Sequence, residues 1–208
     1  AGGLRQRKSS GGEILKTDGL IMIKTKDDLR EYLQCDKMHL GIKHARSRWN
    51  NDIWKYEIAL RRHEYYHNNR KGIINRFLCK YWAWRHHRLG VRLGFTIYVN
   101  TCGKGLRLSH YGSIIINGKA RLGDFCDLHS CVNIGQNGGK ENSINTPTIG
   151  DRVWIGPGAK LFGKITITDG CQIGANAIVN KSFDTPGSVI AGCPAKVLKV
   201  LPIYVSAD

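Results

Sequence analysis

The sequence predicts a mostly β chain, in which a parallel β-helix of six-residue repeats follows an α-helical region. Aliphatic residues recur at every sixth position from Ile149 to Val179, and a second register, offset by four, runs from Val153 to Phe183. Neither a helix nor a flat strand has this period. Near Gly94 the sequence also changes from helical spacing to glycine-rich, β-branched segments, and this change marks the start of the repeat region.

The helical region is expected between residues 25 and 94, in three segments. The first opens at "TKDDLREYL", where a Thr or Asp can cap the helix and acidic residues occupy the first turn. The second, "NNDIWKYEIALRRHEYYHNN", carries a broad apolar stripe and has Asn at both ends. The third starts after Gly72 and ends near Gly90. Residues 1–24, which open with the Gly-, Ser- and Arg-rich stretch "AGGLRQRKSSGGE", are expected to form a flexible tail, and residues 201–208 a carboxyl-terminal tail.

Each hexapeptide of the repeat region, residues 95–200, can supply one short strand and one corner. Three hexapeptides then close a coil, and stacked coils pair strand over strand at roughly 4.8 Å. The first register points inward, and the second places small or medium groups near the corners. Counted backwards, the inward register continues through Ile134, Leu128, Leu122 and Ile116. The spacing from Ile134 to Ile149 is not a multiple of six, so "GQNGGKENSINTPT" is expected to leave the coil as a loop.

Composition adds a strong positive charge and a cysteine pattern. The formal net charge is +16, from 32 Lys and Arg against 16 Asp and Glu, and most of the excess lies before residue 95. Such a charge implies an anionic partner. The seven cysteines are scattered and odd in number, which favours a reduced setting over a disulfide framework. With no apolar run of membrane length and no visible signal peptide, a cytoplasmic location is expected.

The hexapeptides carry a family resemblance. "IGDRVW" followed by "IGPGAK" is typical of the left-handed parallel β-helix acyltransferases. The order of "LRLSHYGSIII", "ARLGDFCDLHSCVNIGQNGG" and "VIAGCPAKVLK" resembles the serine acetyltransferases, and still more their relatives associated with bacterial capsule and exopolysaccharide synthesis. The resemblance covers about residues 95–200. It implies a left-handed coil, an acetyl-CoA-dependent O-acetyltransferase and a homotrimer with active sites between subunits. The helical region is compatible with a trimer or a hexamer.

Two histidines are the candidate catalytic residues. His110 in "LSHYG" matches the catalytic histidine of the resembled family, which accepts the proton of the attacking hydroxyl. Counted back from Ile116, the inward register falls on His110 and would bury it, but the motif match outweighs this count and favours His110 as the base. His129 lies one coil plus one position further on, so it is expected near His110, as a second catalytic group or as a structural histidine.

The resemblance also indicates where acetyl-CoA would bind. The family's cofactor groove, lined by small residues and backbone groups, falls on Gly135, Pro157, Gly158 and Ala175. Lys196 in "GCPAK" matches a basic position near the nucleotide phosphates. No metal is expected, because the γ-type carbonic anhydrases of this fold need three histidines and only His110 and His129 follow residue 87.

The acceptor site departs from the serine enzymes. Ser109 stands where those enzymes have Asp, and Asn145-Thr146 replace the Arg-His pair that holds the amino acid's carboxylate. The carboxylate that orients the histidine falls near Phe95 or Thr96. Because a bidentate Arg is the usual clamp for a carboxylate, a saccharide hydroxyl is the predicted acceptor. Serine O-acetylation is the alternative, and a non-catalytic basic binding module is a remoter one, without a nucleic-acid motif.

Two further segments have two interpretations each. "GQNGGKENSINTPT" is a loop that covers the acceptor or a plain excursion from the coil. "FLCKYWAWRHHRLGVRLG" is a basic, Trp-bearing helix suited to peripheral membrane or lipid-linked glycan contact, or an aromatic stripe that packs on the base of the β-helix. We expect the packed stripe.

Overall fold

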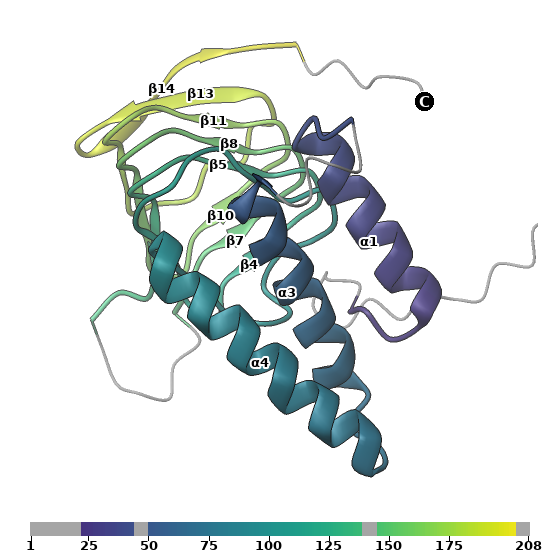
Figure 1. The fold of residues 1–208 in the computed structure, drawn as a ribbon. Coiled ribbons are helices and arrows are strands. Elements are labelled where there is room, and N and C mark those ends of the chain that lie inside the picture. Colours follow the sequence, from purple (N-terminus) through teal and green to yellow (C-terminus); the bar gives the residue numbers. More distant parts are fainter. Residues whose placement is uncertain (1–21, 44–49, 139–144, 203–208) are drawn as a thin grey trace, which may run out of the picture.

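The computed structural model describes residues 22–43, 50–138 and 145–202. Three helices lie at one end of a coiled β-domain, and β13 (Ser188–Gly192) and β14 (Ala195–Val200) lie at the opposite end (Figure 1). The expected tails, except residues 22–24 and 201–202, and the middle of the expected loop, 139–144, lie outside the described residues.

Helices occupy the three segments in which they were predicted. Thr25 caps the first of them, since its hydroxyl accepts from the Asp28 N–H and the Asp28 carboxylate accepts from the Thr25 N–H. The last helix runs three residues beyond Gly90 and stops at Gly94, whose φ of 82° favours glycine. The helices are α1 (Lys26–His39), α3 (Asp52–Asn68) and α4 (Ile73–Leu93).

The strands form three parallel walls of a prism, closed at its end by the antiparallel pair β13–β14. The walls are a five-stranded sheet in the order β1-β3-β6-β9-β12, a three-stranded sheet β10-β7-β4, and a six-stranded sheet β14-β13-β11-β8-β5-β2. The remaining strands are β1 (Phe95–Ile97), β2 (Arg107–Leu108), β3 (Ile114–Ile116), β4 (Arg121–Leu122), β5 (Asp127–Leu128), β6 (Asn133–Gly135), β7 (Thr148–Ile149), β8 (Trp154–Ile155), β9 (Lys160–Phe162), β10 (Thr166–Ile167), β11 (Gln172–Ile173) and β12 (Ile178–Val179).

The two predicted registers form the core of the prism. Every inward position from Ile116 to Val179 is at most 2% exposed, and the second register from Ala120 to Phe183 is at most 6% exposed. Regular coils pair residues eighteen apart, as in the pair of Leu161 with Val179. The predicted loop also leaves the coil, because Leu122 pairs directly with Ile149 across it. The mostly β, hexapeptide-coil prediction is therefore confirmed.

The first coil breaks the six-residue count. Leu108 pairs with Leu128, twenty residues on, whereas Ile116 pairs with Ile134, eighteen residues on. Two additional residues therefore lie between Leu108 and Ile116. The inward position that counting assigned to His110 belongs to Leu108, which is fully buried, and His110 is exposed. The insertion thus moves the histidine out of the core.

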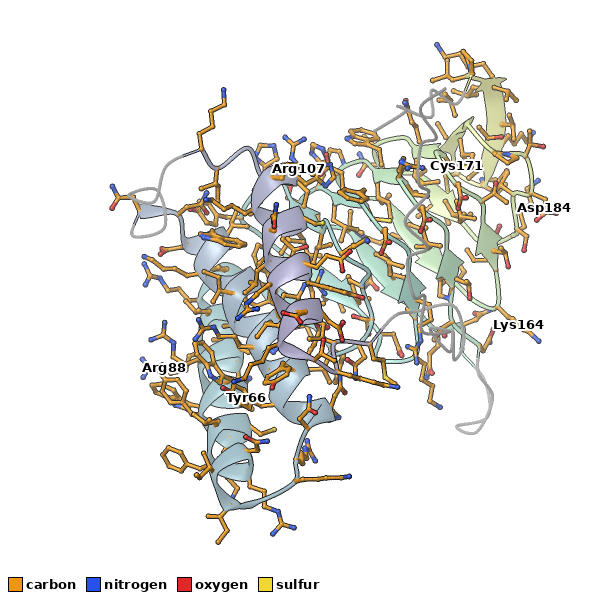
Figure 2. All side chains as sticks on the ribbon, turned by 90° about the vertical axis from the view of Figure 1, so that its right-hand side faces the viewer. Tyr66, Arg88, Arg107, Lys164, Cys171 and Asp184 are labelled. Atoms are coloured by element: carbon orange, nitrogen blue, oxygen red, sulfur yellow. The ribbon has the colours of Figure 1, made fainter. Side chains whose placement is uncertain are left out.

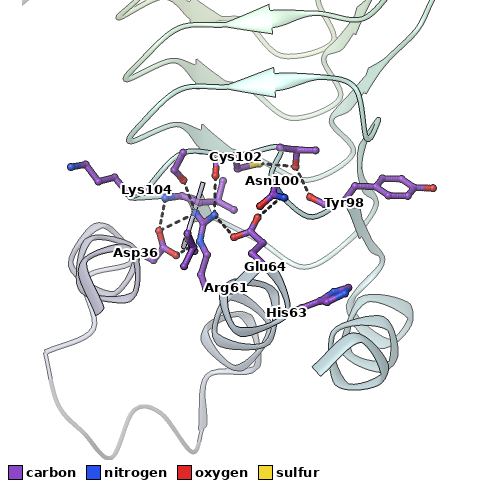
Figure 3. Close-up of polar contacts among 12 residues, drawn as sticks. Asp36, Arg61, His63, Glu64, Tyr98, Asn100, Cys102 and Lys104 are labelled. Carbon is purple, nitrogen blue, oxygen red and sulfur yellow. Dashed lines mark hydrogen bonds and ion pairs between the residues drawn. The ribbon is translucent and has the colours of Figure 1, made fainter. Parts of the chain in front are cut away.

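A buried ion network joins the helices to the start of the coil (Figure 3). The Arg61 guanidinium is completely buried and bonds Asp36, Glu64 and two backbone carbonyls, those of Cys102 and Gly103. These carbonyls belong to the first turn of the coil. The helical region therefore caps the open end of the β-helix, where the Arg61 guanidinium donates hydrogen bonds to backbone carbonyls of the first coil.

A second buried acid on α3, Glu57, gives a testable pH dependence. Burial, with the nearby Asp36 carboxylate, raises the pKa of Glu57 well above its usual value. The folded protein therefore keeps a proton that the unfolded chain releases near pH 4.5, and stability is lost as the pH rises above that value. We expect Glu57→Gln to raise the melting temperature at pH 8 and to leave it nearly unchanged at pH 4, each unit of pKa elevation corresponding to about 1.4 kcal/mol.

Thermal unfolding of both proteins across pH 4–8 checks this expectation. A difference in melting temperature that does not change with pH would contradict it. Asp184→Asn serves as a control, because this acidic residue is exposed.

The aromatic stripe of α4 does not pack on the β-helix as we expected. Phe77 is 70% exposed and Trp84 is 51% exposed, and Arg88 lies over the Trp84 ring at 5.2 Å on the outer side of the helices (Figure 2). The residues of α4 that face inward are instead Cys79, His86, Gly90 and Leu93. Peripheral membrane contact by this face remains a prediction. Within the described residues, none of the helices has the length and apolarity of a membrane span.

Candidate active site

The candidate site lies at the corner where the six-stranded sheet turns into the five-stranded sheet. We call this edge the histidine corner; it comprises residues 109–113, 129–132, 156–159 and 174–177 of successive coils. Six residues lie between Leu108 and Ile115 in the first coil but four between their partners Leu128 and Asn133 in the second, so the first turn is two residues longer. The corner is therefore widest in the first coil, where His110 lies.

The structure brings His110 and His129 together, as their spacing predicted. Their ring centroids are 5.4 Å apart at an interplanar angle of 56°. Trp154, on the next coil, meets the His129 ring edge-on at 4.9 Å. His129 is half-buried against this indole, whereas His110 is exposed. The exposed ring is thus the one that an incoming substrate can reach, and the inner ring supports it.

A carboxylate that the sequence analysis missed lies beside Ser109, the residue before His110. The Ser109 hydroxyl donates to Asp127 Oδ1 at 2.5 Å, and Arg107 Nη1 is 3.4 Å from Asp127 Oδ2. Asp127 is only 9% exposed. Ser109 stands where the resembled enzymes have Asp. Its partner Asp127, on the following coil, places a carboxylate next to this position. The six-residue count gave no signal for it, because the register here is twenty residues and pairs Arg107 with Asp127.

Three of the five residues assigned to the cofactor lie on the same edge as the histidines. Pro157 and Gly158 turn the third coil, and Ala175 turns the fourth. The Gly158 N–H donates to the Ser130 carbonyl, which joins this turn to the segment that carries His129. Pro157 and Ala175 are exposed, so the turns of the third and fourth coils each present a small side chain at the surface.

The other two cofactor candidates lie apart from this group. Gly135 ends β6 at the next corner, where its carbonyl accepts from the Gly163 N–H. Lys196 is on β14, paired with Ala191, and lines a hollow of about 350 Å³ at the closed end of the prism. Within one chain the structure does not bring Gly135 and Lys196 to the histidine corner.

The two positions that replace the amino-acid clamp are uncharged, and Thr146 is already hydrogen-bonded. Thr146 is buried and its hydroxyl donates to the Lys119 carbonyl. Asn145 is half-buried. Thr96, where an orienting carboxylate was expected by count, is an exposed position of β1. The site therefore has no Arg at the place that the resemblance assigns to carboxylate binding.

The stacked six-residue coils and the polar corner define a hexapeptide-repeat protein, and comparison with known proteins agrees. Residues 146–181 match the family model "Bacterial transferase hexapeptide (six repeats)". The chain thus has the hexapeptide-repeat transferase fold.

The relatives in the comparison are named serine acetyltransferase. Those of Helicobacter pylori strain J99 and Mycobacterium tuberculosis strain H37Rv are 36% and 37% identical to this chain, over 46% of its length in both cases. The matches cover 55% and 41% of those two proteins, so the chain spans about half the length of the curated relatives it matches.

Solved structures give the same fold over more of the chain. A Brucella abortus serine acetyltransferase in complex with coenzyme A matches 85% of this chain and 70% of its own, with a TM-score of 0.67 and 22% identity. The soybean apoenzyme matches 83% of this chain and 69% of its own, with a TM-score of 0.64 and 23% identity. At this identity the likeness concerns the fold.

Proposed function

We propose that the protein is an acetyl-CoA-dependent O-acetyltransferase with His110 as its general base. The observation that carries the proposal is the exposed His110 ring, packed against His129 at the head of a corner whose next turns are Pro157, Gly158 and Ala175. The transferase repeat and the name shared by the relatives support the same reaction class.

The proposed reaction is a direct transfer without an acyl-enzyme. A ring nitrogen of His110 takes the proton of the acceptor hydroxyl while the oxygen attacks the thioester carbonyl. The tetrahedral intermediate then collapses, the carbon–sulfur bond breaks, and the imidazolium returns its proton to the leaving thiolate. The hydrogen bond from Ser109 to Asp127 fixes the backbone directly before His110.

We place the pantetheine of acetyl-CoA along Pro157, Gly158 and Ala175, where small residues permit close approach. In the proposed homotrimer, Gly135 and Lys196 of a neighbouring subunit would complete the groove, because one chain does not gather all five residues. The coenzyme A complex of the Brucella abortus enzyme supports a ligand of this class on the fold.

L-serine is the acceptor that the relatives favour, and it replaces the saccharide as our first choice. The predicted saccharide acceptor, with its capsule or exopolysaccharide pathway, has no support among the relatives described above, all of which are named serine acetyltransferase. A saccharide hydroxyl is kept as a second candidate because Asn145 and the engaged Thr146 offer no cation to an amino acid's carboxylate.

Release of coenzyme A thiol by the purified protein separates these acceptors. We expect acetyl-CoA consumption with L-serine, and none with D-serine or with acceptor omitted. Turnover with a saccharide panel but not with L-serine would select the second candidate. Absence of both acetyl-CoA binding and turnover with any hydroxyl acceptor would overturn the proposed function.

A further inference from the structure

A second cluster of reactive side chains lies between α3 and α4, on elements outside the histidine corner. His63 and His67 lie one turn apart on α3, and Cys79 faces them from α4. One potential ligand atom from each of the three residues lies within 4.8 Å of the others. Cys79 is 6% exposed and the two histidines are half-buried.

We propose that His63, His67 and Cys79 bind a transition-metal ion of the Zn²⁺ class that joins α3 to α4. Two imidazoles and a thiolate are the ligands that such ions prefer. Two His at i and i+4 present their rings on one face of a helix, and the third ligand comes from the neighbouring helix, as a cross-link requires. The expectation of a metal-free chain would then hold only for the histidine corner.

The protonation states of the histidines suit this role. Burial, with His67 and Arg70 nearby, lowers the pKa of His63 to about 4. Burial, with Arg70 nearby, also lowers the pKa of His67. Both imidazoles are therefore neutral at pH 7 and have a lone pair to offer, and protons do not compete for it until the solution is acidic.

An outer group orients the His63 ring. Its Nδ1 is 3.2 Å from Nδ1 of His86, and Nε2 of His86 is 2.9 Å from the Tyr56 hydroxyl. When the Tyr56 oxygen accepts from His86, His86 accepts from His63, and Nε2 of His63 carries the free lone pair. An outer hydrogen-bond acceptor that fixes the tautomer of a ligating histidine is usual around protein metal sites, and His86 takes that place here.

The positive charges around the cluster set a condition on binding. Arg70 Nη2 lies 2.7 Å from Nδ1 of His67, and Arg76 and Lys80 line the same hollow as Cys79. Arg70 must release His67 when the metal binds. The negative charge of a metal-bound Cys79 thiolate would offset part of the metal's charge. The exposed Arg70 side chain is free to move into solvent.

The sequence "HEYYH" at 63–67 has the form of the zinc-peptidase motif, but the structure argues for a structural metal. In those enzymes the Glu that follows the first histidine acts on a metal-bound water. Here Glu64 is 2% exposed, and its two oxygens are bonded to Arg61 and to the Asn100 N–H. With its carboxylate committed to the buried network, this Glu has no role as a general base.

Titration of the tag-free full chain with Co²⁺ and Zn²⁺ tests the proposal. We expect about one equivalent of Co²⁺ to give the thiolate-to-cobalt absorption band, and Zn²⁺ to displace it and raise the melting temperature. Cys79→Ser should lose the band, and His67→Gln should weaken binding at least tenfold. His86→Gln should weaken it about 10–100-fold, the usual effect of an outer partner.

Matched controls are Cys35→Ser on α1 and His87→Gln, an exposed neighbour on α4, which should bind as the parent does. Absence of stoichiometric binding by the folded parent would overturn the proposal, as would a thiolate-to-cobalt band that survives Cys79→Ser. Circular dichroism of each variant separates loss of ligand from loss of fold.

Discussion

His110→Ala is expected to lower turnover with the active acceptor by about 10²–10⁴-fold, the contribution of a positioned general base. The physical reason is that the hydroxyl proton then has no acceptor at the exposed head of the histidine corner. The KM for acetyl-CoA should change little, because the residues assigned to the thioester lie on later coils. Initial rates of thiol release across both substrates measure this split.

The neighbouring histidine provides the matched control. His129 is half-buried against Trp154, so His129→Gln should lower turnover less than His110→Ala while leaving the assembly unchanged on gel filtration. The reverse order, with near-normal activity in His110→Ala, would assign the base to His129. Because both variants keep the same coil, such a result would correct the residue and retain the reaction class.

The regular part of the β-helix could be predicted from sequence because its signal is local and repeated. Each coil supplies the same inward positions, so Ile155, Leu161 and Ile167 predict one another at fixed spacing. The start of the first helix was likewise predictable from its capping residue Thr25, whereas the last helix ends at Gly94 and not near Gly90, as was predicted. The repeat thereby identified most of the core before any tertiary contact was known.

The first coil could not be predicted in the same way. Its count is broken by two residues around His110, and nothing in the local sequence indicates which positions are additional. Asp127 was missed because its partner Ser109 is on another coil, and pairing across coils depends on the register that the insertion shifts. The candidate site thus lies where the periodic argument fails.

Arg61 was missed for a different reason. In "EIALRRHEYYH" it reads as one of several charged residues on a solvated face, and burial of a guanidinium has no local signature. It is buried because the open end of the β-helix presents backbone carbonyls that have no coil beyond them. Arg61 of α3 donates hydrogen bonds to these carbonyls. The helical periodicity of the sequence does not indicate that such a partner is required.

Arg61→Met is expected to destabilise the protein by about 3–5 kcal/mol, since it leaves buried carboxylates without a counter-charge. The guanidinium makes five hydrogen bonds: two to Asp36, one to Glu64 and one each to the Cys102 and Gly103 carbonyls. These use all five of its N–H donors. For a chain of this size the melting temperature should fall by roughly 6–20 °C.

Two further variants separate charge from shape. Arg61→Lys keeps the charge but not the planar set of donors, so its melting temperature should lie between those of the parent and Arg61→Met. Combining Arg61→Met with Asp36→Asn and Glu64→Gln removes the uncompensated charges. This triple variant should recover part of the stability that Arg61→Met loses. A fall of less than about 1 kcal/mol in Arg61→Met, read from the shift in melting temperature, would show that the network is not coupled to folding.

The same network ties the helices to the candidate site. Asp36 Oδ1 accepts from the Leu106 N–H, directly before β2, and β2 leads into Ser109 and His110. Loosening Arg61 should therefore move the histidine as well as lower stability. We expect Arg61→Lys, assayed well below its melting temperature, to lose turnover more than acetyl-CoA affinity. Equal loss of both would indicate partial unfolding of the whole coil, and unchanged turnover would show that the first coil holds His110 without the helices.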